Sequence, residues 1–394
     1  PPELYVEVLD KQEVSTIMKY AWEQNIPVVV RGAGTGLAGG ANCKYGGILL
    51  SVMKMNKMIS LDKANMTMTV QPGMLLTEVA AAAAAEGLFY PPDPGEKTAS
   101  IGGIVITNAG GMRAVRYGLT RDFVRCIEAV LPDGEIVQFS SNVVKNTTGY
   151  DVKDLVIGSE GTLCILTEVT LKLMPAPKFT RTLVMPFENL ESCIDMVPRL
   201  LQMAAVPTAI EFLERELIDI VERNLHKLLP VKEGDAVLIV MYDAGSEQEL
   251  LSACTEASDA ALGAGAIDVY IADTPERIAS VWSVRGAILE GMKAESVAQE
   301  ECDVVVPRAK IAEYVRLAKS IGAKYGIRVE PCGHAGDGNI HTEMLRDASM
   351  SDEDWIKGTR ACLTELYGVS KRFGGQLSGE HGIGSGKIKY LVDS

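Results

Sequence analysis

The sequence predicts a two-domain protein in which both parts combine helices with strands. Three observations predict this fold class: a length of 394 residues, a hydrophobic content of 47%, and short apolar runs that alternate with helical patterns. A chain of this length exceeds what one small core needs, so two domains are expected. Pro175 and Pro177 mark the first boundary, because longer amphipathic helices between single strands follow them.

The first part consists of short segments separated by glycine-rich loops. The apolar patterns predict strands within residues 5–10, 26–32, 46–52, 67–73, 126–134, 135–139 and 161–175, and helices at 11–24 and 76–86.

The second part alternates more regularly. Strands are predicted at 237–243, 266–272, 303–307 and 328–331, and helices at 247–262, 275–293, 308–325 and 352–373. This α/β alternation favours a sheet covered by helices, in which parallel and antiparallel strands are mixed.

Composition excludes several classes of function. The net charge of −14 and pI near 4.9 argue against nucleic-acid binding, which needs a basic surface. No apolar run reaches the roughly eighteen residues of a membrane span, so no transmembrane segment is expected. The 8 cysteines are scattered without a CxxC pair, which favours a reducing, cytoplasmic location. The chain opens at Pro1 without a visible secretory signal, and we expect residues to be missing at both ends.

Three of the 4 histidines lie in two short segments, GHAGDGNIH at 333–341 and SGEHGIG at 378–384. His334 and His341 flank a Gly-Asp-Gly-Asn turn, so the chain can bring both imidazoles to one point. Glu380 adds a carboxylate, and His381 a further imidazole. Two histidines and one glutamate are a common ligand set for a divalent metal, and a neighbouring imidazole suits proton transfer. The alternative is that these are ordinary turn histidines.

The segment RGAGTGLAGGA at 31–41 follows an apolar strand and contains the pattern GxGxxG at Gly34, Gly36 and Gly39. A Rossmann dinucleotide site would require a helix after this loop and an acidic residue about twenty positions on, whereas another strand and Lys54 follow. Loop amides can instead hold a pyrophosphate without a helix. Further glycine segments, at 91–95, 100–103, 108–111 and 160–163, are either ordinary turns or the walls of a large planar ligand site, and their density favours the second interpretation.

Seven motifs in order give the chain a resemblance to a known family: RGAGTGLAGG, PPDPG, SIGG with NAGG, NTTGYD, EGTLCILTEVTLKL, GHAGDGNIH and SGEHGIG. Together they resemble the FAD-linked D-2-hydroxyacid dehydrogenases. This family includes D-lactate dehydrogenases and the flavin subunit of glycolate oxidase, within the vanillyl-alcohol oxidase flavoprotein superfamily.

The resemblance implies an α+β fold with a two-part FAD-binding domain of the PCMH type and a cap domain. It replaces the mixed sheet of the cap with a largely antiparallel one. The implied boundaries are 1–175 for the FAD-binding domain, 176–374 for the substrate or cap domain, and 375–394 for a C-terminal segment that returns to the FAD domain. The family continues beyond this segment, so a C-terminal remainder is expected.

The resemblance also assigns roles to residues. FAD would be bound by Gly32, Ala33, Gly34, Thr35, Gly36, Pro92, Asp93, Ser100, Gly103, Asn108, Gly110, Gly111, Gly161 and Ile165. It would be non-covalent, because the glycine loop holds no histidine. One divalent ion (Zn, Fe or Mn) would be bound by His334, His341 and Glu380. His381 would be the catalytic base, and Arg285 would bind the substrate carboxylate unless it is a solvent-facing helix residue.

The implied activity is oxidation of a small D-2-hydroxy acid, with D-lactate to pyruvate as the best guess. The acceptor of the electrons would be an electron-transfer flavoprotein, an iron–sulfur subunit or a quinone, and such a partner could place the protein at a membrane surface. Glu301 stands where some relatives carry a lysine, which favours a monocarboxylate. Cys164 replaces a common family glycine. The alternatives are a glycolate oxidase flavin subunit, a metal-dependent hydrolase with structural glycine loops, and a non-catalytic flavin subunit.

Overall fold

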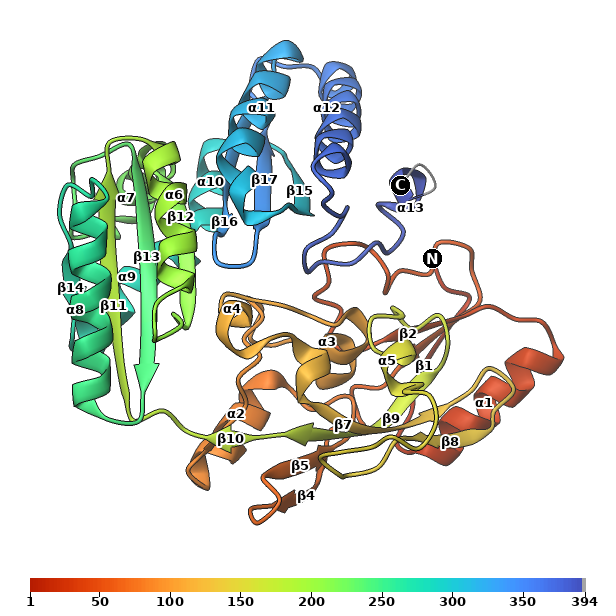
Figure 1. Ribbon diagram of the computed structural model, residues 1–394. Coiled ribbons are helices and arrows are strands. Elements are labelled where there is room, and N and C mark those ends of the chain that lie inside the picture. Colours follow the sequence, from red (N-terminus) through yellow and green to blue (C-terminus); the bar gives the residue numbers. More distant parts are fainter. Residues whose placement is uncertain (392–394) are drawn as a thin grey trace. The chain divides into compact units, whose positions relative to one another are not determined.

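The structure, a computed structural model, describes residues 1–391 and divides them into two compact units (Figure 1). Unit 1 contains Pro1–Gly111, Tyr117–Ala176 and Glu380–Lys389. Unit 2 contains Met112–Arg116, Pro177–Gly379 and, among the described residues, Tyr390 and Leu391. The segment that starts at Glu380 therefore groups with the N-terminal unit.

Unit 1 is built on three small sheets. A parallel sheet has the order β1-β3-β2, and an antiparallel sheet has the order β4-β5-β9-β7-β8. A third sheet pairs β6 with β10. The strands are β1 (Leu4–Glu7), β2 (Val28–Arg31), β3 (Ile48–Ser51), β4 (Met58–Asp62), β5 (Thr67–Val70), β6 (Leu88–Phe89), β7 (Val124–Val130), β8 (Ile136–Phe139), β9 (Ile165–Lys172) and β10 (Met174–Pro175).

Two apolar cores hold unit 1 together. One packs α1 against the parallel sheet, and the other packs α2 and α3 against β5, β7 and β9. The helices of this unit and its margins are α1 (Lys11–Glu23), α2 (Leu76–Ala85), α3 (Ile101–Thr107), α4 (Ala114–Tyr117), η1 (Thr120–Phe123), α5 (Lys153–Val156) and α13 (Ile388–Leu391).

One glycine segment of unit 1 begins a helix. The sequence SIGG, expected to be either a turn or a wall of a ligand site, forms the N-cap and the first residues of α3. Ile101, Ile104 and Val105 have the spacing of one helix face, and all three are buried. Gly102 lies on this helix against Pro72, where a β-carbon would come within 2.7 Å of the proline side chain. The glycines here allow close packing of a helix.

Unit 2 contains a seven-stranded sheet with the order β14-β11-β13-β12-β16-β17-β15. Every neighbouring pair is antiparallel, which confirms the antiparallel cap sheet. The strands are β11 (Phe179–Phe187), β12 (Ala209–Glu214), β13 (Ala236–Ala244), β14 (Tyr270–Ala272), β15 (Gln299–Val305), β16 (Arg328–His334) and β17 (Asn339–Leu345). The mixed sheet favoured by the α/β alternation is therefore wrong.

Strand interleaving explains this difference. Helices α6 (Leu190–Leu201) and α11 (Ile311–Lys324) each connect two strands of the same direction, as a crossover helix should. However, β13 lies between β11 and β12, and β17 lies between β15 and β16. Each inserted strand runs against both neighbours, so no parallel pair remains in this sheet. Local apolar periodicity does not show which strand occupies the middle.

Helices cover both faces of this sheet (Figure 1). Helices α7 (Arg215–Leu225), α9 (Pro275–Gly286) and α10 (Ile288–Glu295) contribute to one apolar core with the strands. Helices α6, α8 (Glu247–Gly263), α11 and α12 (Asp352–Arg372) contact the opposite face. The expected single helix at 275–293 is two helices that meet at Ala287, directly after Gly286.

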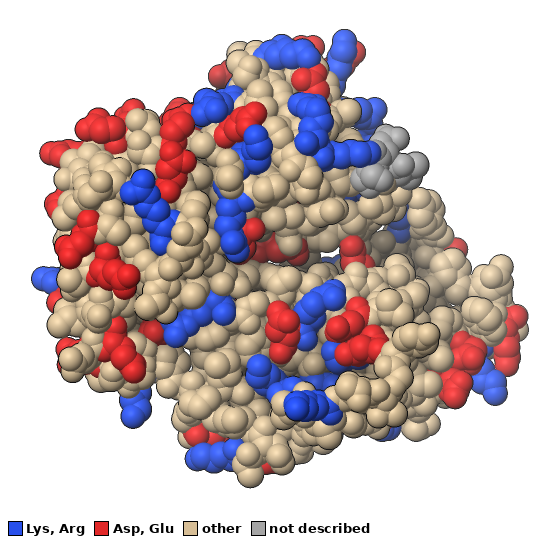
Figure 2. Space-filling model, viewed as in Figure 1, with Lys and Arg blue, Asp and Glu red and all other residues tan. Residues whose placement is uncertain are grey.

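All 8 cysteines are buried, and none forms a disulfide. Among the described residues, no helix has both the length and the apolar character that a membrane span requires. Acidic and basic side chains are interspersed on the face shown in Figure 2.

Candidate active site

The two histidines of the GHAGDGNIH segment are placed by a tight hairpin. β16 ends at His334, β17 begins at Asn339, and these two residues are paired in register. Gly338 has φ +90° in the connecting turn, and a β-carbon there would overlap the carbonyl oxygen of Val306. Glycine is therefore required at this position. His341 pairs with Cys332, so the side chains of His334 and His341 lie on the same face of the sheet.

The two imidazoles meet edge to face. Their ring centroids are 5.2 Å apart with an interplanar angle of 89°, and the two Nε2 atoms are separated by 3.4 Å. Both residues are buried in the sheet. The predicted convergence of His334 and His341 is thus present within unit 2.

A carboxylate holds the other nitrogen of each ring. His334 Nδ1 lies 2.6 Å from Glu211 Oε1, and His341 Nδ1 lies 3.1 Å from Glu301 Oε1. A carboxylate only accepts, so each Nδ1 carries the proton and donates it. In the neutral ring, the lone pair is then on Nε2. Both lone pairs point toward the same small region.

This geometry fits two ligands of one cation. Zinc–nitrogen bonds are about 2.0–2.1 Å long, and a tetrahedral angle between two of them separates the nitrogens by about 3.4 Å. The observed separation of His334 Nε2 and His341 Nε2 is 3.4 Å. Carboxylates behind metal-binding histidines are the usual way to fix the tautomer and ring orientation.

Further acidic residues surround the histidine pair. Glu343 is buried and pairs in register with Glu301 across β17 and β15. Burial, and next the charge of Glu301, raise the pKa of Glu343 to about 8, although His341 lowers it. A negative environment of this kind favours a cation over an anion.

Arg285 lies in the last turn of α9, and its side chain is 17% exposed. Its Nε donates to Glu211 Oε2 at 2.7 Å, so the carboxylate that holds His334 also holds Arg285. The alternative of a solvent-facing helix arginine is wrong. Arg285 and His334 are instead two neighbours of one buried group.

The strand edge beside His341 also fixes the start of the second histidine segment. Asp303 pairs in register with His341 and is 1% exposed. Its carboxylate accepts from Ser378 Oγ at 2.7 Å and from the Gly379 amide at 3.1 Å. The first two residues of this segment, Ser378 and Gly379, are therefore anchored to the residue opposite His341.

In unit 1 the predicted glycine segments pack against one another. The Ala33 amide donates to Ser100 Oγ at 3.2 Å, and a β-carbon on Gly32 would overlap the same hydroxyl oxygen. A β-carbon on Gly111 would overlap the carbonyl oxygen of Asp93. Loops that are distant in sequence thus pack against each other so closely that side chains larger than glycine would not fit at Gly32 and Gly111.

The EHGIG segment joins the same group of loops. The Ile383 and Gly384 amides donate to the two oxygens of Glu160, at 2.7 and 2.6 Å. The amides of Ser385 and Gly386 donate to the carbonyl oxygen of Ala38 in the glycine loop, at 3.0 and 3.1 Å. The catalytic-base candidate His381 is therefore carried by a loop that is bonded to two of the predicted cofactor segments.

The other predicted cofactor residues lie around these contacts. Asn108 has φ +50°, ends α3, and accepts from the Arg121 amide at 3.0 Å. Gly110 adjoins Glu380, since a β-carbon on Gly110 would lie 3.3 Å from Glu380 Oε2. Ile165 is 3% exposed and belongs to the core of the parallel sheet. The remaining predicted residues are Gly34, Thr35, Gly36, Pro92, Gly103 and Gly161, all in unit 1.

Sequence reasoning missed the supporting carboxylates Glu211, Asp303 and Glu160. One signal was present: Glu211 interrupts the apolar run AIEFL of β12 and is 1% exposed. A charged residue inside a buried strand is rare unless it is paired, so its position indicates a partner. The partners His334 and Arg285 are distant in sequence and were not predictable from this signal.

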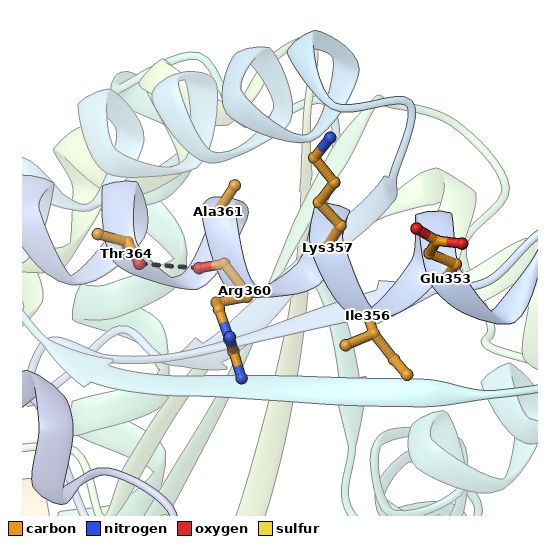
Figure 3. A pocket seen from close by; sticks show the side chains of 6 residues that line it. All are labelled: Glu353, Ile356, Lys357, Arg360, Ala361 and Thr364. Atoms are coloured by element: carbon orange, nitrogen blue, oxygen red, sulfur yellow. Dashed lines mark hydrogen bonds between the residues drawn. The ribbon is translucent and has the colours of Figure 1, made fainter.

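A hollow elsewhere does not belong to this site. It lies along α12 and is lined by Glu353, Ile356, Lys357, Arg360, Ala361 and Thr364 (Figure 3). All six residues are on one helix, and none is among the predicted site residues. The bond drawn, from Thr364 Oγ1 to the Arg360 carbonyl oxygen at 2.8 Å, is internal to the helix.

Comparison with family models gives two matches. Residues 2–140 match the FAD binding domain, and residues 176–394 match the C-terminal domain of FAD linked oxidases. Among solved structures, p-cresol methylhydroxylase with substrate bound aligns with a TM-score of 0.79 and 16% identity, over 99% of this chain and 82% of that one. This likeness shows a shared fold.

Curated relatives match nearly the whole chain. A D-lactate dehydrogenase of Anaerostipes hadrus is 46% identical over 100% of this chain and 84% of that protein. A D-lactate dehydrogenase of Archaeoglobus fulgidus is 39% identical over 98% and 83%, respectively. The glycolate oxidase subunit GlcD of Bacillus subtilis is 34% identical over 99% and 82%.

Proposed function

Because this chain belongs to the FAD-linked oxidases and is an FAD-dependent oxidoreductase, we propose that it oxidises a small D-2-hydroxy acid, with D-lactate as the best candidate. Two relatives, at 46% and 39% identity, carry the name D-lactate dehydrogenase. The observation that carries the proposal is the pair of Nε2 atoms 3.4 Å apart in unit 2. A hydrolase whose glycine loops are merely structural does not fit a chain with an FAD binding domain.

The cofactor FAD would be bound non-covalently by unit 1. Gly32 to Gly36 would supply amides to the pyrophosphate, and the packed segments at Asp93, Ser100 and Gly111 would form the walls. FAD, when bound, supplies the acceptor of the substrate hydride. The loops of this chain then orient the cofactor and exclude water from it.

The divalent ion would be held by His334, His341 and Glu380. The first two have the spacing of ligand atoms, and Glu380 follows directly after Gly379, which is anchored to Asp303. A bound divalent ion supplies Lewis-acid polarisation of the substrate hydroxyl. Zn, Fe and Mn are the candidates, because nitrogen and carboxylate ligands suit all three.

Two residues of this chain would act on the substrate directly. His381, on the loop that Glu160 holds, would accept the hydroxyl proton as a neutral imidazole. Arg285 would bind the substrate carboxylate and select which face of the carbinol is presented, while Glu211 fixes its guanidinium. Orientation by a fixed arginine determines the enantiomer that reacts.

A monocarboxylate is the proposed substrate class. Glu301, 20% exposed and bonded to His341, adds negative charge beside a proposed metal ligand, and like-charge repulsion would disfavour a second substrate carboxylate there. Glycolate is the second candidate, because GlcD of Bacillus subtilis is 34% identical. The electrons would pass to a flavoprotein, an iron–sulfur subunit or a quinone, and a cytoplasmic location, with or without a membrane-bound partner, stays a prediction.

Anaerobic reduction of the flavin tests the substrate. Purified enzyme is mixed with D-lactate, L-lactate, glycolate and D-2-hydroxyglutarate, and the flavin absorbance is followed without any partner protein. We expect rapid bleaching with D-lactate and much slower bleaching with L-lactate and the dicarboxylate. Faster reduction by L-lactate would contradict the proposed stereochemistry, and a flavin that no hydroxy acid reduces would favour a non-catalytic subunit.

Removal of the metal tests the second cofactor. Enzyme treated with a chelator should retain its flavin spectrum but lose reduction by D-lactate, and Zn²⁺ or Mn²⁺ should restore it. The matched variant His334→Ala should show the same loss without recovery. Full reduction by enzyme that contains no metal would contradict the metal role.

A further inference from the structure

Glu211 is a charged residue in an unusual place. It lies in the middle of β12, between Ile210 and Phe212, and is 1% exposed. An unpaired carboxylate at this depth would be strongly destabilising. Two donors, the imidazole of His334 and the guanidinium of Arg285, lie against its carboxylate and offset its burial.

Its two oxygens have separate partners. Oε1 accepts from His334 Nδ1 at 2.6 Å, and Oε2 accepts from Arg285 Nε at 2.7 Å. His334 is fixed opposite Glu211 by the register of β12 and β16, whereas Arg285 comes from α9, a helix packed on the sheet. One side chain thus connects a strand residue to a helix residue.

We propose that Glu211 is a positioning residue that serves two groups of the active site at once: it holds the His334 imidazole with its proton on Nδ1 and fixes the guanidinium plane of Arg285. The inference rests on the proposed function, in which His334 binds the metal and Arg285 binds the substrate carboxylate. Glu301 performs the first of these tasks for His341, at 3.1 Å from its Nδ1. Glu211 joins the metal side of the site to the substrate side.

The substitution Glu211→Gln separates this role from simple packing. A carboxylate offers two acceptor oxygens, whereas an amide of the same shape offers one acceptor and one donor. The amide side chain can therefore accept from His334 or from Arg285 but not from both. Because the arginine is always charged, the amide oxygen should turn to Arg285 and the amide NH₂ to His334. His334 would then have to accept at Nδ1 and carry its proton on Nε2, the nitrogen needed for the metal.

The matched control is Glu330→Gln. Glu330 is also buried on a strand of the same sheet, at 2% exposure, and its carboxylate accepts from Arg328 Nε at 2.7 Å. Among the described residues it has no bond to a histidine. Glu330 pairs in register with Glu343, so Glu330→Gln tests the loss of a buried carboxylate beside an arginine on the same sheet, while both carboxylates that hold the histidines, Glu211 and Glu301, stay in place.

Two measurements test the inference on FAD-loaded protein whose thermal unfolding shows that it is folded. The first is Zn²⁺ affinity by competition with a chelator, for which Glu211→Gln should bind about 10–100-fold more weakly than wild type, as lost supporting carboxylates do. The second is the tautomer of His334, read from ¹⁵N histidine chemical shifts, which are tractable because the chain has 4 histidines. We expect the proton on Nδ1 in wild type and on Nε2 in Glu211→Gln.

A second substitution should reverse the effect. In Glu211→Gln combined with Arg285→Met, the amide oxygen has no arginine to satisfy and can turn back to His334. The double variant should then bind Zn²⁺ at least tenfold more tightly than Glu211→Gln does, and its affinity should approach that of Arg285→Met alone. A purely structural ion pair between Glu211 and Arg285 predicts no recovery, because both halves of the pair are gone.

The outcomes separate this inference from the proposed function. If wild-type protein shows the Nδ1 proton on His334 but binds no divalent metal, the metal role falls and the positioning of His334 stands. If wild type binds Zn²⁺ and Glu211→Gln binds it equally well, or Glu330→Gln weakens it by the same factor, the inference is overturned. A wild-type His334 with its proton on Nε2 would overturn it as well.

Discussion

Replacement of Glu160 should loosen the loop that carries His381 without removing any reacting group. Two backbone amides, of Ile383 and Gly384, donate to the two oxygens of this carboxylate at 2.7 and 2.6 Å. Hydrogen bonds to charged groups contribute about 1.5–3 kcal/mol each. Glu160 is half-exposed, so we take the lower value, which gives about 3 kcal/mol for both bonds and about a 10²-fold shift in the local opening equilibrium.

Hydrogen exchange measures this shift directly. In Glu160→Ala the amides of Ile383 and Gly384 should exchange about 10²-fold faster than in wild type, and in Glu160→Gln, which keeps one acceptor oxygen, about tenfold faster. Turnover should fall by about 10²-fold in Glu160→Ala, because a small displacement of a proton acceptor is costly. The FAD content should be unchanged, since Ser385 and Gly386 stay bonded to Ala38.

The control for this experiment is Glu168→Ala. Glu168 is another partly buried glutamate of unit 1, paired with Lys11 at 3.6 Å, and it has no bond to the EHGIG segment among the described residues. It should alter neither the exchange of the two amides nor turnover. Unchanged exchange in Glu160→Ala, or equal effects of the two substitutions, would refute the reasoning.

Three further predictions follow from single features. His381→Ala should retain FAD and lower turnover by about 10²–10⁴-fold, as loss of a general base does. Stopped-flow measurement of flavin reduction tests this, and a near-normal rate would show that another group is the base. Gly338→Ala should destabilise the protein by about 1–3 kcal/mol in denaturant unfolding, because the turn requires φ +90° and a β-carbon meets Val306; an unchanged midpoint would contradict this. The 8 thiols are buried, and burial raises the pKa of Cys164 to about 11. The native protein should therefore react negligibly with a thiol reagent at pH 7. Rapid reaction would show that at least one buried cysteine becomes exposed in the native protein.

Local sequence patterns determined the histidine hairpin well. The Gly-Asp-Gly-Asn turn between His334 and His341 is a short-range signal, and the structure brings both rings together on adjacent strands. The same is true of helix α12, predicted at 352–373 and found at Asp352–Arg372. These features depend on residues close in sequence, for which periodicity and turn chemistry are informative.

Features that depend on distant residues were not predictable in the same way. The direction of the cap strands depends on β13 and β17, each inserted between two strands that a helix connects. The residue patterns predict no element within residues 178–236, which contain β11, α6, β12 and α7. Their strands are buried on both faces and lack the simple alternation of a half-exposed strand. The family resemblance corrected the strand direction where the residue patterns did not.

The residues proposed to act on the substrate and the metal have two kinds of support, which should respond differently to substitution. His334 and His341 project from neighbouring strands of a seven-stranded sheet, so their backbone positions are set by the ladder and their ring orientations by Glu211 and Glu301. His381 lies on a loop, and the position of that backbone depends on bonds to Glu160 and Ala38. Loss of a carboxylate behind a strand histidine should therefore change its tautomer while its amide exchange stays slow. Loss of the carboxylate behind the loop should raise amide exchange and leave the strand histidines unchanged. If both substitutions gave the same pattern, the supports would be parts of one cooperative unit, and the separate roles assigned to them would be wrong.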